Sequence, residues 1–224
     1  MANDQTAKVE WKPGGVPVST RFDDPYFSLE NGLAESRHTF LAGNNLPARL
    51  RDGFQVAELG FGAGLNMLAL AAAWRGPGRV RFTSFEAWPM AADDIAKALA
   101  PFGALDALAR PFLAAWADGA RRFQAGGLEV EVIIGDATRT LPAWQGQADA
   151  WFLDGFSPAK NPDLWSEALM REVGAHTMPG GSFATYSAAG HVRRALTAAG
   201  FTVSRQPGYG RKRHMSVGRL ADGL

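Results

Sequence analysis

Cysteine is absent from the 224-residue sequence, and only four histidines are present. Without cysteine the chain can form no disulfide, thiolate metal site or iron–sulfur cluster, and it has no thiol nucleophile. The histidines are too far apart for the usual spacing of metal ligands, so we expect no bound metal. They are His38, His176, His191 and His214.

Long apolar runs are also lacking. No stretch approaches the roughly 18 apolar residues of a membrane span, and the N-terminal sequence lacks the basic-then-apolar order of a signal peptide. At about 150 residues per domain, a chain that is 46% hydrophobic is long enough for one large domain with its own core. We therefore expect a soluble, cytoplasmic protein without a membrane partner.

The formal net charge of +1 conceals an uneven distribution. Residues 1–172 carry 16 Lys and Arg against 21 Asp and Glu, whereas residues 173–224 carry seven against one. The small net charge argues against a nucleic-acid partner, but the asymmetry indicates a basic surface near the C-terminal end. A merely solvated basic face is the alternative.

From residue 54 onward, short apolar runs alternate with helical patterns, which predicts an α/β fold with a mostly parallel sheet of seven strands and helices on both faces. The expected strands are Phe54–Leu59, Val80–Glu86, Val130–Ile134, Ala150–Leu153, Ser182–Tyr186, Phe201–Arg205 and Met215–Arg219. The expected helices are Leu65–Trp74, Pro89–Ala100, Leu105–Phe123, Asp163–His176 and Gly190–Ala199. Residues 1–53 break this rhythm, and we interpret them as an extension packed on the 54–224 domain, with one short strand, Val16–Arg21.

A glycine-rich turn, ELGFGAGLN, stands between the first of these strands and the first helix. Glycines at such a turn let the backbone approach a ligand, and the helix N-terminus favours a nucleotide-like group. The third glycine follows the first by four residues rather than the five of the dinucleotide fingerprint. An acid two residues before the turn would repel a pyrophosphate but suits the sulfonium and ammonium of S-adenosylmethionine. We therefore predict that this donor, rather than NAD, is bound by Glu58, Gly60, Gly62, Gly64 and Asn66; a plain tight turn is the alternative.

Two further acids follow the next strands in chain order. Glu86 comes 26 residues after Gly60, where a carboxylate can accept both ribose hydroxyls, and Trp88 is placed to flank the adenine. Asp136 is placed to accept from the adenine amino group. Each acid is also suited to be the N-cap of a helix, so that alternative stays open.

The fourth strand delivers Asp154 into an aromatic and proline-rich loop, DGFSPAKNP. The loop resembles the D/N-P-P-Y/F loop of methyltransferases that modify amino nitrogens, although Gly155 and Ser157 stand where that motif has proline. In such enzymes the polar side chain holds the nucleophile and the aromatic ring stacks on a base. We therefore predict Asp154 as the catalytic residue, orienting the amine first and acting as general base second, with Phe156 as a stacking platform.

Several segments together resemble the methyltransferase domain of the MnmC tRNA-modification family. They are ELGFGAGLN, FLDGFSPAKNPDLW, FDDPYFSLENGLAESRHTFLAGNNLPARL, ATYSAAGHVRRALTAAGFTV and GYGRKRHM, and the resemblance runs from about Val16 to Met215. It implies a class I, Rossmann-like methyltransferase that uses S-adenosylmethionine. The implied reaction methylates the 5-aminomethyl group of (2-thio)uridine at the tRNA wobble position, giving 5-methylaminomethyl-(2-thio)uridine.

The resemblance also implies partners. The anticodon stem-loop of tRNA would be the substrate, with Tyr26 and Tyr186 joining Phe156 around the flipped uridine. Phosphate contacts would come from the basic segment and its neighbours, namely Lys160, Arg193, Arg211, Lys212 and Arg213. Lys160 is equally suited to neutralise Asp163. Two-domain members of the family add an FAD-dependent oxidase. This sequence has no second glycine fingerprint, so we expect the stand-alone form without FAD, with a separate oxidase as its partner. The alternative that the sequence is a piece of a longer, two-domain chain stays open.

The missing cysteine bears on the reaction as well. Methylation at pyrimidine C5 generally needs a thiol, and radical enzymes need cysteine-bound clusters, whereas an exocyclic amine needs neither. Two other functions stay open: methylation of a free small amine, which would leave the basic segment unexplained, and a non-catalytic RNA-binding module. An NAD-dependent oxidoreductase is the least favoured reading.

Overall fold

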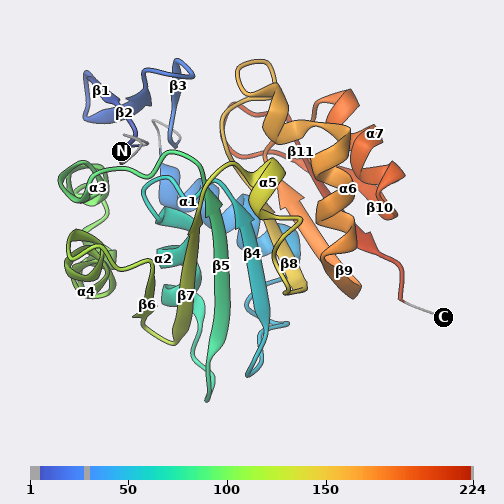
Figure 1. The fold of residues 1–224 in the computed structure, drawn as a ribbon, viewed down its shortest axis with the longest axis horizontal. Coiled ribbons are helices and arrows are strands. Elements are labelled where there is room, and N and C mark those ends of the chain that lie inside the picture. The colour runs from blue at the N-terminus through green and yellow to red at the C-terminus, as the bar shows by residue number, and fades with distance from the viewer. Residues whose placement is uncertain (1–5, 28–30, 223–224) are drawn as a thin grey trace.

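The central sheet of the computed structural model, which describes residues 6–27 and 31–222, has eight strands. In spatial order they are β10 (Phe201–Pro207), β11 (His214–Leu220), β9 (Thr177–Thr185), β8 (Ala148–Leu153), β4 (Gln55–Leu59), β5 (Val80–Glu86), β7 (Leu128–Ile134) and β6 (Arg122–Ala125). The five strands from β9 to β7 are parallel, β11 runs antiparallel to both of its neighbours, and β6 runs antiparallel to β7 (Figure 1). The predicted α/β architecture is confirmed.

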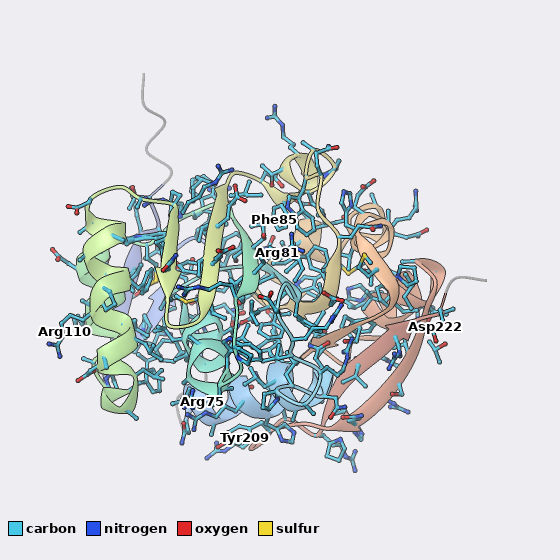
Figure 2. The ribbon with its side chains drawn as sticks, turned by 90° about the horizontal axis from the view of Figure 1, so that it is seen from below. Arg75, Arg81, Phe85, Arg110, Tyr209 and Asp222 are labelled. Carbon is cyan, nitrogen blue, oxygen red and sulfur yellow. The ribbon has the colours of Figure 1, made fainter. Side chains whose placement is uncertain are left out.

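Helices cover both faces of this sheet because the central strands are apolar on both sides. In β4, Val56 packs into the core beneath one set of helices, and the next residue, Ala57, packs into the core beneath the other. The first set is α1 (Gly32–Ser36), α2 (Leu65–Ala73), α3 (Ala92–Leu99) and α4 (Asp106–Ala117), and the second is α5 (Ala137–Thr140), α6 (Glu167–Ala175) and α7 (Gly190–Ala198). Figure 2 shows α4, with Arg110, at one flank of the molecule and Asp222, after β11, at the other.

One predicted helix is too long, and the sheet consequently has one strand more than expected. The helix expected over Leu105–Phe123 ends at Ala117, and Gly119 follows with a φ of 83° that a helix cannot continue. The chain then forms β6 and turns back into β7 at Gly126. A strand of four residues is too short to show a period in the sequence.

The N-terminal extension forms a separate small sheet of β1 (Val9–Lys12), β2 (Val16–Ser19) and β3 (Asp24–Pro25). The strand expected over Val16–Arg21 is present but shorter, and its two neighbours were not predicted. Residues 1–5 and 28–30 of the extension lie outside the described residues. In Figure 1 the small sheet lies above the carboxyl ends of β4 and β5, so the extension covers this edge of the central sheet.

After this sheet, α1 continues into a π-helix (Arg37–Leu41) and a 3-10 helix (Ala42–Asn44). The remaining 3-10 helices are Gly103–Leu105 and Pro162–Trp165. In the described part of the chain no single helix meets the length and apolarity needed to cross a membrane, although the bent pair Ala92–Leu99 and Gly103–Ala117 meets them jointly.

Asn44 joins the extension to the middle of the central sheet. Its Nδ2 donates to the carbonyl oxygens of Phe40, at 3.0 Å, and Trp151 in β8, at 3.1 Å. Its Oδ1 accepts from the hydroxyl of Ser182 in β9, at 2.6 Å. The side chain is buried, so these bonds are not exchanged for water. One amide therefore ties the extension to two neighbouring strands.

We expect Asn44→Ala to lower the free energy of unfolding by about 2–4 kcal/mol, because it leaves the Ser182 hydroxyl without its acceptor and the Trp151 carbonyl without a donor in the core. Urea denaturation followed by circular dichroism measures this change. Gln145→Ala, at an exposed position, is the control and should stay within about 0.5 kcal/mol of the parent. Equal midpoints for the two variants would contradict the anchoring role.

Candidate active site

A cavity of about 580 Å³ opens where the parallel strands end beneath the extension. Ten residues predicted from the sequence line it: Tyr26, Gly60, Gly62, Asn66, Glu86, Asp154, Phe156, Tyr186, Arg211 and Lys212. The other predicted residues lie outside its lining: Glu58, Gly64, Trp88, Asp136, Lys160, Arg193 and Arg213. Ligands of such sheets bind at the carboxyl ends of the strands, which makes this cavity the candidate active site.

The glycine loop adopts backbone conformations that only glycine takes readily. Gly60 has a φ of 85°, and Gly64, the N-cap of α2, has a φ of 75°. A Cβ at Gly60 would lie 3.2 Å from the Cα of Gly155, so the loop after β4 touches the loop after β8. Glycine is required here both by the turn and by this close approach.

Glu86, at the end of β5, holds the glycine loop from its other side. Its carboxylate accepts from the backbone N–H of Gly62, at 3.0 Å, and of Trp88, at 2.7 Å. Burial raises the pKa of this carboxyl, and these N–H donors oppose the rise. The indole of Trp88 has the guanidinium of Arg21 over it, 4.2 Å from the ring centroid.

Asp154 faces the cavity from the end of β8. Its Oδ2 accepts from Nδ2 of Asn66, at 2.7 Å, and its Oδ1 accepts from the N–H of Gly155, at 2.8 Å. Burial raises the pKa of Asp154 to about 6, against the lowering effects of these two donors and of the Lys212 ammonium; Glu35 adds to the rise. A carboxyl with this pKa can exchange a proton near neutral pH.

Glu58 lies behind Asn66 rather than in the cavity lining. The side chain is fully buried, its Oε1 accepts from Nδ2 of Asn66 at 3.0 Å, and its Oε2 accepts from the hydroxyl of Ser84 at 2.7 Å. Burial raises the pKa of Glu58 well above its usual range. The sequence suggested a carboxylate that meets the ligand, whereas the structure holds this one within the chain.

Aromatic rings from both ends of the chain surround the Asp154 loop. Phe156 stacks on Phe22 with centroids 4.7 Å apart and meets Tyr26 edge to face at 5.1 Å. Tyr186 donates from its hydroxyl to the carbonyl oxygen of Gly155, at 2.7 Å. Phe22 was not predicted, although it belongs to the same FDDPYF segment as Tyr26.

Two acids of that segment also hold the loop. Asp24 accepts from the backbone N–H of Ser157, at 2.8 Å. Asp23 pairs with Lys160, whose Nζ lies 3.0 Å from its Oδ2. The partner of Lys160 is therefore Asp23 rather than Asp163, the acid considered from the sequence. Neither contact was predicted, because nothing in the local sequence joins residues more than 130 positions apart.

Lys212, expected to contact phosphate, has an acidic partner within the cavity. Its Nζ lies 2.5 Å from Oε1 of Glu35 in α1 and 4.3 Å from the centroid of the Tyr186 ring. Glu35 was not predicted, because α1 has only five residues and shows no period. Arg211 lines the cavity beside Lys212, and Arg213 is exposed outside it.

Asp136 and Arg193 are two of the predicted residues that lie outside the cavity lining. Asp136 is exposed and caps α5, accepting from the N–H of Thr138 at 2.9 Å and from its hydroxyl at 2.8 Å. The helix-cap alternative left open for Asp136 is thus what the structure shows. Arg193 lies in α7, and its buried Nε has no hydrogen-bond partner among the described residues. In the same residues no group of three or more His, Asp or Glu side chains is arranged to hold a metal ion.

Comparison with known proteins points to one family. Residues 103–221 match a family model described as S-adenosyl-L-methionine-dependent methyltransferase. The tRNA 5-methylaminomethyl-2-thiouridine biosynthesis bifunctional protein MnmC of Caulobacter vibrioides is 45% identical over 214 residues, which cover 91% of this chain and 36% of that protein. The MnmC protein of Ralstonia nicotianae is 45% identical over 216 residues, covering 92% of this chain and 33% of that protein. The chain thus spans about a third of the length of these relatives.

Solved structures agree on the fold. MNMC2 from Aquifex aeolicus superposes with a TM-score of 0.75 at 24% identity, covering 97% of this chain and 72% of that one. CalS10, an amino pentose methyltransferase from Micromonospora echinaspora solved with its S-adenosylmethionine bound, gives a TM-score of 0.51 at 13% identity, covering 86% of this chain and 93% of that one. The predicted class I methyltransferase fold is confirmed.

The raised pKa of Asp154 predicts a pH-dependent stability. Because its pKa is about 6 in the folded chain against an ordinary 3.8, the folded state keeps a proton that the unfolded chain releases between these values. The stabilisation from this group is therefore complete below about pH 4 and is lost as the pH rises through 6. Asp154→Asn has no carboxyl to titrate at this position. As the pH rises across this range, the free energy of unfolding of the parent should therefore fall relative to that of the variant.

Urea denaturation at a series of pH values from about 4 to 7 measures the difference. Asp136→Asn removes an exposed carboxylate from a helix cap and is the matched control. For each variant, the difference in unfolding free energy from the parent is followed against pH. If this difference changes no more for Asp154→Asn than for Asp136→Asn, the burial of the Asp154 carboxyl is contradicted.

Proposed function

The chain belongs to the S-adenosyl-L-methionine-dependent methyltransferase family, and we propose that it transfers the donor's methyl group to the 5-aminomethyl group of (2-thio)uridine at the tRNA wobble position. The observation that carries this proposal is the contact between the glycine loop and the loop after β8, at Gly60 and Gly155. It places Asp154 beside the loop assigned to the donor, within one cavity.

The residues present fit the donor. The cradle at Gly60 and Gly62 is one that a Cβ would fill, since a Cβ at Gly62 would lie 3.3 Å from the Tyr26 ring. Glu86 is a buried carboxylate at the end of the neighbouring strand, suited to accept the ribose hydroxyls. When bound, S-adenosylmethionine supplies an electrophilic methyl group. We propose that Gly60, Gly62, Gly64 and Glu86 hold it, and contacts from Trp88 and Asp136 stay predictions.

Asp154 acts on the amine. An alkylammonium with a pKa of about 10.4 must lose a proton before its nitrogen can attack, and positioning of that nitrogen dominates the rate of an in-line displacement. A carboxylate at this place accepts a hydrogen bond from the amine and stabilises the positive charge that grows on nitrogen. Because the pKa of Asp154 is only about 6, it orients the amine first and accepts a proton second.

The aromatic wall suits a flipped base. Tyr26, Phe156 and Tyr186 line the cavity around Asp154, and rings in this arrangement stack on an extruded pyrimidine. Phe22 covers one face of Phe156, so the base would use the remaining surface. We propose that this wall holds the uridine while Asp154 holds its aminomethyl group.

The phosphate contacts are assigned to the loop before β11. Lys160 and Lys212 are paired with Asp23 and Glu35. We assign Arg211, which lines the cavity, and Arg213, which is exposed near it in sequence, to the phosphates of the anticodon stem-loop. A phosphate contact from Arg193 stays a prediction.

The curated relatives are described as bifunctional. We propose that an FAD-dependent oxidase, fused or separate, supplies the aminomethyl substrate, and we assign no residue of this chain to FAD or to a metal. The cytoplasm is the proposed compartment.

Labelled S-adenosylmethionine and tRNA from a strain blocked at the aminomethyl stage test the proposal. Nucleoside analysis should find 5-methylaminomethyl-(2-thio)uridine, and Asp154→Ala should lower the rate by about 100-fold or more while calorimetry shows donor binding retained. Transfer to free amines but not to this tRNA would establish the small-amine enzyme instead. RNA binding without any transfer would establish a binding module.

Arg211→Ala combined with Arg213→Ala should weaken tRNA affinity and lower the salt slope of log K by about 1–2, because each phosphate contact releases counterions. Filter binding between about 50 and 200 mM salt measures the slope, and donor affinity should not change. Arg75→Ala with Arg110→Ala, two exposed arginines shown in Figure 2, is the matched control. Identical salt slopes for the two double variants would mean that Arg211 and Arg213 lie on a solvated face and do not contact tRNA phosphates.

A further inference from the structure

The amide of Asn66 stands between two carboxyl groups. Its Nδ2 donates both hydrogens, one to Oε1 of Glu58 at 3.0 Å and one to Oδ2 of Asp154 at 2.7 Å. Its Oδ1 accepts from the hydroxyl of Ser36, at 2.6 Å. Three bonds from three different elements thus fix which end of the amide faces Asp154, and the residue is buried.

Glu58 is built as an anchor for this amide. Both of its oxygens have partners within the chain, Asn66 and Ser84, and the side chain is fully buried outside the cavity lining. Burial also raises the pKa of Glu58 well above its usual range, which favours its neutral form. A carboxyl that lies behind the lining, with a donor from the chain on each oxygen, directs neither oxygen at a ligand in the cavity.

Asp154 is held by one donor on each oxygen. The N–H of Gly155 binds Oδ1 at 2.8 Å, and Asn66 binds Oδ2. Each carboxylate oxygen has a second lone pair, which stays available to a group in the cavity. The amide of Asn66 therefore sets both the orientation of Asp154 and part of the pKa of its carboxyl.

We propose that Asn66 is the positioning residue of Asp154 and that Glu58 acts through Asn66, by holding its amide, rather than by meeting the donor's positive charges. The inference rests on the proposed function for one point, that Asp154 meets the reacting amine. It assigns Glu58 a role different from the one that the sequence suggested.

The other groups around Asp154 come from separate elements and stay in place in the variants below. Lys212, in the loop before β11, lowers the pKa of Asp154, whereas Glu35, in α1, raises it. Asp154 raises the pKa of the Tyr186 hydroxyl, which follows β9, and Glu58 faces Asp154 across Asn66. Removing the Asn66 bond from this fixed background should raise the pKa of Asp154.

The first test compares two substitutions of Glu58. Glu58→Gln keeps the shape, with its carbonyl oxygen toward Asn66 and its amide toward the Ser84 hydroxyl, and should restore most of the rate that Glu58→Leu loses. We expect kcat for tRNA methylation to fall about 10–100-fold in Glu58→Leu, with the KM for S-adenosylmethionine within about twofold in both variants. A tenfold or larger rise in the donor Kd of Glu58→Gln would overturn the inference, because it would mean that the charge of Glu58 meets the donor.

The second test reads Asp154 directly. In Asn66→Ala the acid limb of kcat/KM and the carboxyl titration of Asp154 by ¹³C NMR should both move to higher pH by at least about half a unit. Asn161→Ala, the same substitution in the loop after β8 but outside the cavity lining, is the matched control. Ser36→Ala removes only the hydrogen bond that orients the Asn66 amide, so the pKa of Asp154 should shift in the same direction by a smaller amount. This variant replaces Asn66→Ala in the titration if Asn66→Ala does not fold.

The NMR titration separates the two proposals because it needs no substrate. A shifted titration in a chain that does not methylate tRNA would defeat the proposed function and leave the positioning intact. Methylation of tRNA with an unmoved titration in both Asn66→Ala and Ser36→Ala would overturn the positioning and leave the function standing.

Discussion

The rest of the site depends on the contact between two loops at the carboxyl ends of adjacent strands. The loop after β4 and the loop after β8 approach so closely that a Cβ at Gly60 would lie 3.2 Å from the Cα of Gly155. A Cβ at Gly155 would lie 2.2 Å from Leu164, and its φ of 123° is itself one that glycine tolerates. This approach brings the amide of Asn66, at the start of α2, to the carboxylate of Asp154. It also leaves the Gly155 carbonyl directed at Tyr186.

Buried carboxyls then set the electrostatic character of the cavity. Glu58, Glu86 and Asp154 all lose hydration, which raises the pKa of each, and the chain offsets this cost with its own donors. The donors are two backbone N–H groups for Glu86, one for Asp154, the Ser84 hydroxyl for Glu58, and the Asn66 amide shared by Glu58 and Asp154. The three carboxyls therefore differ in their surroundings: Glu58 is enclosed within the chain, whereas Glu86 and Asp154 line the cavity.

Most of the central fold was predictable, because buried parallel strands are continuous apolar runs. The same regularity placed Glu86 and Asp154 at the ends of strands and in one cavity. Local sequence did not reveal the partners of Lys160 and Lys212, since Asp23 and Glu35 lie 137 and 177 residues away. Nor did it separate a cap from a ligand contact at Asp136, because the same residue types serve both. The unpredicted strands β1, β3 and β6, of two to four residues, are too short to show a period.

The Lys212–Glu35 pair joins an early helix to the last hairpin of the described chain, so its formation closes the largest loop that any of the contacts above closes. Closing such a loop costs entropy before the contact stabilises anything, and contacts of this separation are slow to form. During synthesis, the parallel strands and the glycine loop have all emerged before the hairpin that carries Lys212. Because Glu35 and Lys212 both line the cavity, its lining is complete only after the chain as far as Lys212 has been made and this contact has formed.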